Sequence, residues 1–150
     1  MVDVGSLDIN GSNRGLFRKC DYRGIDIVRG KNVDEVGLAH LLLCNLDNYF
    51  DTVISTEMLE HDKYWELSLH AMYRALKPGG LLLITAAGDG REEHGTHDHH
   101  AYCSPGTLDY YCNISNEMFA SVLCPKMFKT YFINQNPKSF DINFYGIKSG

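Results

Sequence analysis

Apolar runs alternate with polar, glycine-containing turns along this chain, and their spacing predicts alternating strands and helices. The first run, residues 1–4, breaks into a turn rich in Gly, Ser, Asn and Asp that lasts to residue 12. A helix is predicted over residues 13–19, and residues 22–27 form a second strand with a carboxylate near its end. This order is the turn with which α/β proteins hold a nucleotide-like ligand at a helix N-terminus.

The middle of the chain continues the alternation. Residues 50–56 combine the apolar Phe50, Val53 and Ile54 with β-branched threonines and are predicted to form a buried parallel strand. A helix follows, with Asp62 as its predicted N-cap and the Lys-Pro-Gly-Gly turn at residues 77–80 as its end. Its apolar residues recur at helical spacing and form one stripe: Trp65, Leu69, Met72 and Leu76. Residues 81–87 are the next apolar strand.

The last third begins with residues 88–111, a polar stretch without periodicity that is long for a connection inside a domain. It follows the carboxyl end of a predicted strand, where parallel sheets bind ligands. A short helix from an N-cap at Ser115 to residue 123 precedes two strands, residues 127–133 and 140–147. With a short strand at residues 33–36, the pattern predicts one α/β domain over residues 1–150, its mostly parallel sheet ending in an antiparallel hairpin with helices on both faces.

Composition narrows the function classes. The 150 residues suit one domain, and 44% hydrophobic and 22% charged residues are ordinary for a globular chain. A formal charge of −5 without a basic run argues against nucleic acid as a partner. The five cysteines form no C-x-x-C pair, and no apolar run reaches membrane-spanning length. We therefore expect a soluble, cytoplasmic protein with free thiols that binds neither nucleic acid nor membrane; its oligomeric state is not indicated.

The first loop departs from the dinucleotide fingerprint G-x-G-x-x-G. Counted from Gly5, that fingerprint requires glycine at positions that are occupied by Leu7 and Asn10, and the next glycine is Gly11. The missing glycines and the final hairpin argue against an NAD-type oxidoreductase, which stays open as an alternative.

Four motifs in order carry a resemblance instead. They are the strand end Asp3-Val4-Gly5-Ser6, the acid Asp26, the stretch from Phe50 to His61, and the stretch from Leu76 to Ile84 with its Lys-Pro-Gly-Gly turn. In these motifs the chain resembles the class I S-adenosylmethionine-dependent methyltransferases of the type 11-like branch. The resemblance implies a Rossmann-like methyltransferase fold, S-adenosylmethionine as cofactor, and methyl transfer to an oxygen or nitrogen of a small-molecule acceptor.

Two expectations qualify the resemblance. Members of that family commonly carry helices before the first strand, whereas here the first strand begins at residue 1 or 2, so the chain is either a minimal version or shortened at its N-terminus. A non-catalytic S-adenosylmethionine-binding module therefore stays open as a second alternative.

The resemblance also implies cofactor-binding residues. They lie in the loop and at the ends of strands: Asp3, Gly5, Ser6, Gly11, Asp26, with Ile27 against the adenine face and Ser55 near the methionine end. The family's adenine-binding acid is replaced here by Leu38, so recognition of the adenine passes to backbone groups near Ala39 or to His40.

Catalytic candidates follow from the need for a general base near neutral pH. They are His94 in the long loop, and Glu57 and His61, which are four apart and would share a face if that segment were helical. Tyr110 and Tyr111 are expected to form a wall of the substrate pocket.

A metal site is the competing interpretation of the long loop, since five possible ligands fall within seven residues: His94, His97, Asp98, His99 and His100. Adjacent ligands on a flexible loop rarely converge without a scaffold. We therefore predict a solvated, mobile loop and no metal site.

Overall fold

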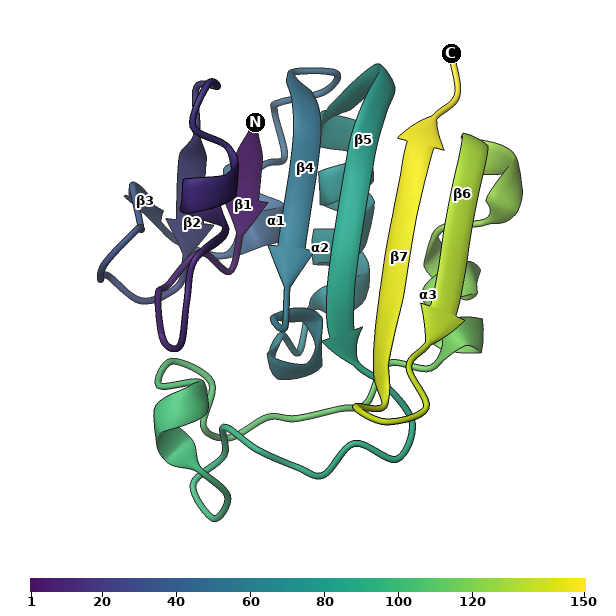
Figure 1. Cartoon of the computed structure of the whole chain (residues 1–150). Helices are drawn as coiled ribbons and strands as arrows, with labels where there is room; N and C mark the ends of the chain where they lie inside the picture. Colours follow the sequence, from purple (N-terminus) through teal and green to yellow (C-terminus); the bar gives the residue numbers. More distant parts are fainter.

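A computed structural model describes residues 1–150 as one seven-stranded sheet with the strand order β3-β2-β1-β4-β5-β7-β6 (Figure 1). The strands are β1 (Val2–Val4), β2 (Arg23–Asp26), β3 (Glu35–Val36), β4 (Phe50–Thr56), β5 (Leu76–Ala87), β6 (Phe128–Gln135) and β7 (Asp141–Lys148). Strands β1 to β5 pair in parallel, whereas β7 pairs antiparallel with both β5 and β6. The predicted sheet and its closing hairpin are confirmed.

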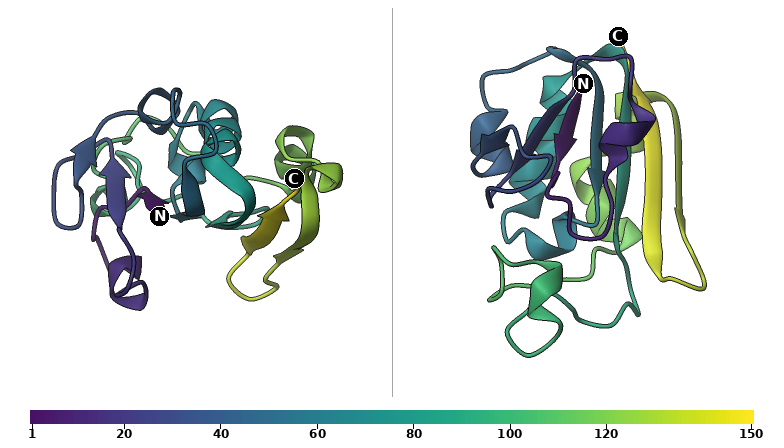
Figure 2. Two further views of the ribbon diagram at one scale, coloured as in Figure 1. Left: turned by 90° about the horizontal axis from the view of Figure 1, so that it is seen from above. Right: turned by 60° about the vertical axis from the view of Figure 1, so that its left-hand side comes forward.

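The three α-helices, α1 (Ala39–Leu42), α2 (Trp65–Ala75) and α3 (Asn116–Val122), lie on the same face of the sheet (Figures 1 and 2). On the opposite face lies the short 3-10 turn η1 (Asn13–Leu16). The predicted apolar stripe is buried, since Trp65, Leu69 and Met72 of α2 all belong to the core, as does Leu76, which is the first residue of β5. From Gly80 to Ala86 of β5, buried residues alternate with half-buried ones, so one face of this strand is buried more deeply than the other. None of the helices has the length and apolarity needed to cross a membrane.

Three local predictions need correction. The helix expected over residues 13–19 is only the four-residue η1, because none of its residues is buried and a short helix without a buried face is not stable. Asp62 does not occupy the N-cap position of α2, which belongs to Tyr64; its carboxylate instead accepts hydrogen bonds from Tyr64 N (2.8 Å) and Ser68 Oγ (2.5 Å). The Lys-Pro-Gly-Gly turn is part of β5, where the register against β4 shifts.

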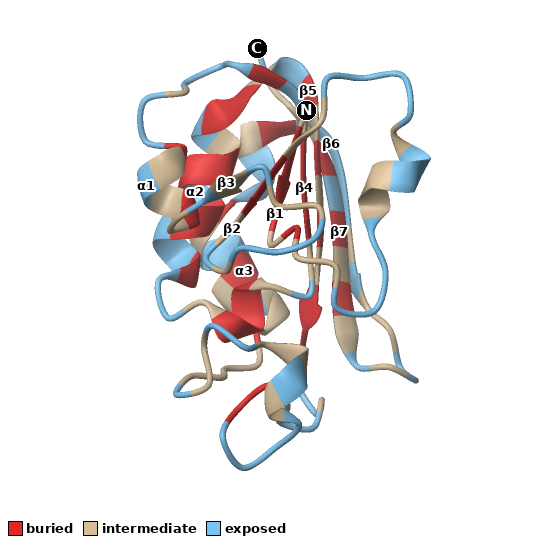
Figure 3. Cartoon of the chain, turned by 90° about the vertical axis from the view of Figure 1, so that its left-hand side faces the viewer, coloured by how far each residue is buried: buried red, intermediate tan, exposed pale blue.

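The long stretch over residues 88–111 runs beneath the carboxyl ends of the parallel strands and contains the 3-10 turn η3 (Ala101–Cys103) (Figure 1). Its histidines from position 97 to 100 are exposed, as predicted, but Gly95 and Thr96 are buried. Figure 3 shows the loop below the sheet as mostly exposed or half-buried with a short buried portion. A Cβ atom on Gly106 would lie 2.8 Å from the Ile27 side chain, so this part packs tightly against the end of β2. The stretch therefore forms part of the ligand-binding edge.

Candidate active site

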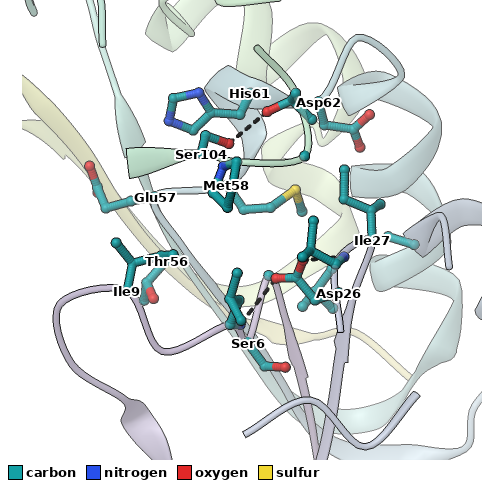
Figure 4. Close-up of a pocket in the computed structure, with 18 of the residues that line it drawn as sticks. Ser6, Ile9, Asp26, Ile27, Thr56, Glu57, Met58, His61, Asp62 and Ser104 are labelled. Atoms are coloured by element: carbon teal, nitrogen blue, oxygen red, sulfur yellow. Dashed lines mark hydrogen bonds between the residues drawn. The ribbon is translucent and has the colours of Figure 1, made fainter. Parts of the chain in front are cut away.

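A cavity of about 570 Å³ opens where β1, β2 and β4 end, between the first loop and the long stretch that follows β5 (Figure 4). Residues from all of these segments line it, among them Gly5, Asp26, Met58, His61 and Ser104. The carboxyl edge of the parallel sheet thus carries a cavity, as predicted.

The first loop leaves β1 through Gly5, whose φ of 82° lies in the left-handed region. The backbone N–H groups of Gly5 and Ser6 both donate to the carbonyl of Ile25, at 2.9 and 3.1 Å. A Cβ atom on Gly5 would lie 2.6 Å from the Cβ of Met58. Glycine is therefore needed for the turn and also for the close approach of Met58, which lines the cavity.

Asp26 lies at the end of β2, where its two carboxylate oxygens accept hydrogen bonds from Leu7 N (3.0 Å) and Val28 N (2.9 Å). The first bond ties β2 to the first loop, and both fix the direction of the carboxyl group. Burial raises the pKa of Asp26 above its usual value. Each oxygen keeps a lone pair that can accept from a ligand hydroxyl at the cavity edge.

Asp3 is the middle residue of β1 and is 2% exposed. Tyr22 donates its hydroxyl proton to one carboxylate oxygen of Asp3, whereas the other oxygen has no partner. Burial raises the pKa of this carboxyl group. Asp3 lines the cavity and also braces β1 against Tyr22, so it combines a site position with a structural contact.

The remaining predicted cofactor residues divide into two groups. Ser6, Gly11, Ile27 and Ala39 line the cavity. His40 and Ser55 do not: the His40 ring packs edge-on against Tyr64 at 5.2 Å, and Ser55 is fully buried within β4. The neighbouring Thr56 lines the cavity in place of Ser55, because alternate residues of a strand face opposite sides.

All three catalytic candidates, Glu57, His61 and His94, line the same cavity. Glu57 has a φ of 53° and accepts a hydrogen bond from Thr85 Oγ1 at 2.7 Å. A left-handed backbone at a non-glycine residue is unusual and is enriched at functional sites. Glu57 and His61 do not share a helix face, because the helical turn here, η2 (Leu59–His61), is a 3-10 turn that begins after Glu57.

The two histidines form an aromatic cluster with the predicted pocket wall. The His61 and His94 rings are nearly perpendicular with centroids 5.0 Å apart, and Tyr111 packs against both, at 5.6 and 5.1 Å. Burial, aided by the charge of His94, lowers the pKa of His61 to about 4. Tyr110 lines the cavity, whereas Tyr111 stands behind the histidines.

Glu60 is a residue that the sequence did not single out. It is fully buried in η2, and neither carboxylate oxygen has a hydrogen-bond partner. Burial and, second, the charge of Glu57 raise the pKa of Glu60 to about 8. In the sequence, the position of Glu60 directly before His61 was the one feature that could have identified it as a site residue. Met58, Arg91 and residues 103–107, which also line the cavity, gave no signal because their positions depend on tertiary packing.

Comparison with known proteins agrees with this geometry. A family model described as a methyltransferase domain matches residues 15–84. A structure of a S-adenosylmethionine-dependent methyltransferase from Archaeoglobus fulgidus superposes with a TM-score of 0.66 at 16% identity, over 98% of this chain and 85% of that one. Phosphoethanolamine N-methyltransferase 2 of Haemonchus contortus in complex with S-adenosyl-L-methionine gives 0.67 at 19% identity, over 100% of this chain and 48% of that one.

Residues 15–84 thus match a methyltransferase domain, and the whole chain has the fold of class I methyltransferases. At the sequence level, this chain is 28% identical to (S)-coclaurine N-methyltransferase of Papaver somniferum over an alignment of 95 residues, and the match covers 54% of this chain and 26% of the plant protein. This chain thus spans about half of the nematode enzyme, and its match covers about a quarter of the plant enzyme.

Proposed function

We propose that this methyltransferase domain binds S-adenosylmethionine in the cavity at the carboxyl edge of its sheet and transfers the methyl group to an oxygen or nitrogen of a small-molecule acceptor. The observation that carries the proposal is the pairing of the Gly5 turn with the oriented carboxylate of Asp26 on adjoining walls of one cavity. The glycine turn lets a ligand come close to the backbone, and the fixed carboxylate can accept hydrogen bonds from ribose hydroxyls. Together these two features suit an adenosyl ligand.

The cavity has two chemically different ends. The cofactor end is formed by the first loop, Asp26 and Ile27, and there the ribose hydroxyls would donate to Asp26 while the adenine packs on Ile27. The acceptor end is formed by Glu57, His61 and His94, with Tyr110 as a further wall. Because methyl transfer from a sulfonium requires mainly the alignment of nucleophile, methyl carbon and sulfur, the protein's main contributions are positioning and a base.

Two further features favour this function over the alternatives. An NAD-type site would need the glycine fingerprint, which the first loop lacks. A purely binding module would have no need of ionisable groups at the far end of the cavity, whereas Glu57, His61 and His94 gather there. The net charge of −5 favours a small acceptor over nucleic acid.

Calorimetric titration with S-adenosylhomocysteine and with NAD tests the cofactor assignment. We expect S-adenosylhomocysteine to bind and NAD not to bind, and Asp26→Ala to weaken binding at least about tenfold, because two ribose hydrogen bonds to a charged group are lost. Asp21→Ala is the matched control, since the exposed Asp21 side chain lies outside the cavity. Equal binding by the Asp26→Ala variant and the wild type would contradict the assignment.

Catalysis needs its own assay. Release of S-adenosylhomocysteine, measured over a panel of small hydroxyl and amine compounds, should exceed the rate without acceptor for at least one of them. Binding of S-adenosylhomocysteine without turnover on any compound would favour the non-catalytic alternative.

A further inference from the structure

Three side chains of metal-ligating type meet at the acceptor end of the cavity. One ligand atom from each of Glu60, His61 and His94 lies within 4.8 Å of the other two. Glu60 and His61 come from η2, and His94 comes from the long stretch after β5. Neighbouring histidines on a loop lack a rigid support for a metal site. Here η2, which is distant from His94 in the sequence, supplies that support.

The polar atoms of this cluster are buried without partners. Both carboxylate oxygens of the fully buried Glu60 and Nδ1 of His61 make no hydrogen bond. The nearby cation, Arg91, is engaged in an ion pair with Asp141 at 3.0 Å. Buried polar groups in native proteins are almost always satisfied, so three neighbouring unsatisfied atoms indicate an additional bound species.

His94 is oriented as a ligand. Its Nδ1 lies 3.0 Å from the carbonyl oxygen of Glu92, and because a carbonyl only accepts, Nδ1 carries the proton and Nε2 keeps its lone pair. Metal-binding histidines typically donate their other ring N–H to a carbonyl or carboxylate in this manner. The Tyr111 hydroxyl donates to the same carbonyl at 3.2 Å, and the Tyr111 ring packs against the imidazole rings of both histidines.

We propose that Glu60, His61 and His94 bind a divalent transition-metal ion and that an open coordination position of this ion faces the acceptor end of the cavity. Two imidazoles and one carboxylate form the ligand set of zinc sites that keep a position open. Tetrahedral ligands about 2.0–2.2 Å from zinc stand roughly 3.4 Å apart, so atoms within 4.8 Å of one another would close by at most roughly 1.4 Å. His94 lies on a loop and can supply that movement.

The direction of the open position follows from burial. His61 and His94 line the cavity, whereas Glu60 lies behind them. The coordination position that these three residues leave open on the ion would therefore face the cavity. Given the proposed methyltransferase function, on which this step rests, an acceptor hydroxyl bound there would lose its proton to solvent more readily. Its oxygen lone pair would then bond the methyl carbon while the C–S electron pair passes to sulfur. The acceptor class is accordingly a hydroxyl compound.

Titration of the metal-free chain with Co²⁺, monitored by visible absorption, tests the site. We expect one Co²⁺ per chain, displaced by Zn²⁺, and at least about tenfold weaker binding in Glu60→Gln and His94→Ala. His99→Ala is the control, because His99 is exposed on the same loop and should bind Co²⁺ as the wild type does. Circular dichroism of each variant establishes that it is folded, and His94→Ala remains informative if Glu60→Gln does not fold.

Further measurements distinguish a failure of the metal site from a failure of the proposed methyltransferase function. Acetohydroxamate, an oxygen ligand, should change the Co²⁺ spectrum, and an unchanged spectrum would overturn the open position. A wild-type chain that binds S-adenosylhomocysteine but no Co²⁺, or variants that retain full Co²⁺ affinity, would overturn the metal site and leave the methyltransferase assignment standing. Binding of Co²⁺ through these residues without binding of S-adenosylhomocysteine would support the metal site and overturn the proposed function.

Discussion

Adding one methyl group at three glycines of the N-terminal segment should have three different consequences. Gly5 has a φ of 82° and no room for a Cβ, which would lie 2.6 Å from two atoms of the Met58 side chain. Gly11 has a φ of 148° but open space around it. Gly15 has neither a positive φ nor a neighbour within 4 Å. The series Gly5→Ala, Gly11→Ala and Gly15→Ala therefore separates backbone strain from steric overlap.

The expected magnitudes follow from these two costs. A left-handed backbone at a residue with a Cβ costs about 1–2 kcal/mol, and overpacking costs about 1–3 kcal/mol. Gly5→Ala should therefore lose about 2–5 kcal/mol of unfolding free energy, Gly11→Ala about 1–2 kcal/mol, and Gly15→Ala about none. At roughly 2–4 °C per kcal/mol for a domain of this size, the first loss lowers Tm by about 4–20 °C.

Thermal and urea denaturation of the three variants measure these losses. Because Met58 lines the cavity, Gly5→Ala should also reduce the increase in Tm that S-adenosylhomocysteine produces, whereas Gly15→Ala should not. If Gly5→Ala destabilised the domain no more than Gly11→Ala, the close packing of the first loop against Met58 would be refuted.

Three further predictions concern the cofactor end, the core and a helix cap. Burial raises the pKa of Asp26, and only the ionised carboxylate accepts two ribose hydrogen bonds. The affinity for S-adenosylhomocysteine should therefore fall as the pH falls through that raised pKa. In calorimetry, the Asp26→Asn variant should bind weakly, and its affinity should depend much less on pH. Leu69→Ala should lower the free energy of unfolding, measured by urea denaturation, by about 2–5 kcal/mol, because Leu69 is fully buried in α2. Leu67→Ala, on the exposed side of the same helix, should lower it little. Equal losses in the two variants would contradict the packing of α2. Ser115→Ala should lose about 0.5–2 kcal/mol in thermal melting, because the Ser115 hydroxyl accepts from Met118 N at 3.1 Å, and Ser115→Asn should restore most of that loss.

Where the sequence pattern succeeded, the deciding interaction was local or periodic. Strand β4 was predicted with its observed bounds, because its apolar and β-branched residues are those that a strand at the centre of a sheet prefers. The stripe beginning at Trp65 predicted α2 to within one residue at its end. Ser115 was recognised as the cap of α3 because a hydroxyl before a helical run satisfies a free N–H group.

Predictions failed where neighbours in space decide the outcome. The helix expected after residue 12 shrank to η1, since helical propensity without a buried face is insufficient. Ser55 has the right residue type beside the cavity, but strand alternation turns it away and presents Thr56. The histidines from position 97 to 100 looked like a ligand cluster in the sequence, yet they are exposed, and only His94 joins other ligands.

The sequence by itself determined the order of strands and helices, the Gly5 turn and the carboxylate of Asp26, because each depends on residues within about one helical turn or on a simple period. Only the tertiary structure decided that the stretch after β5 folds back beneath the sheet, and that it places His94 beside His61 and the buried Glu60. That meeting depends on packing between segments more than thirty residues apart, and no local pattern of residues encodes such a distance.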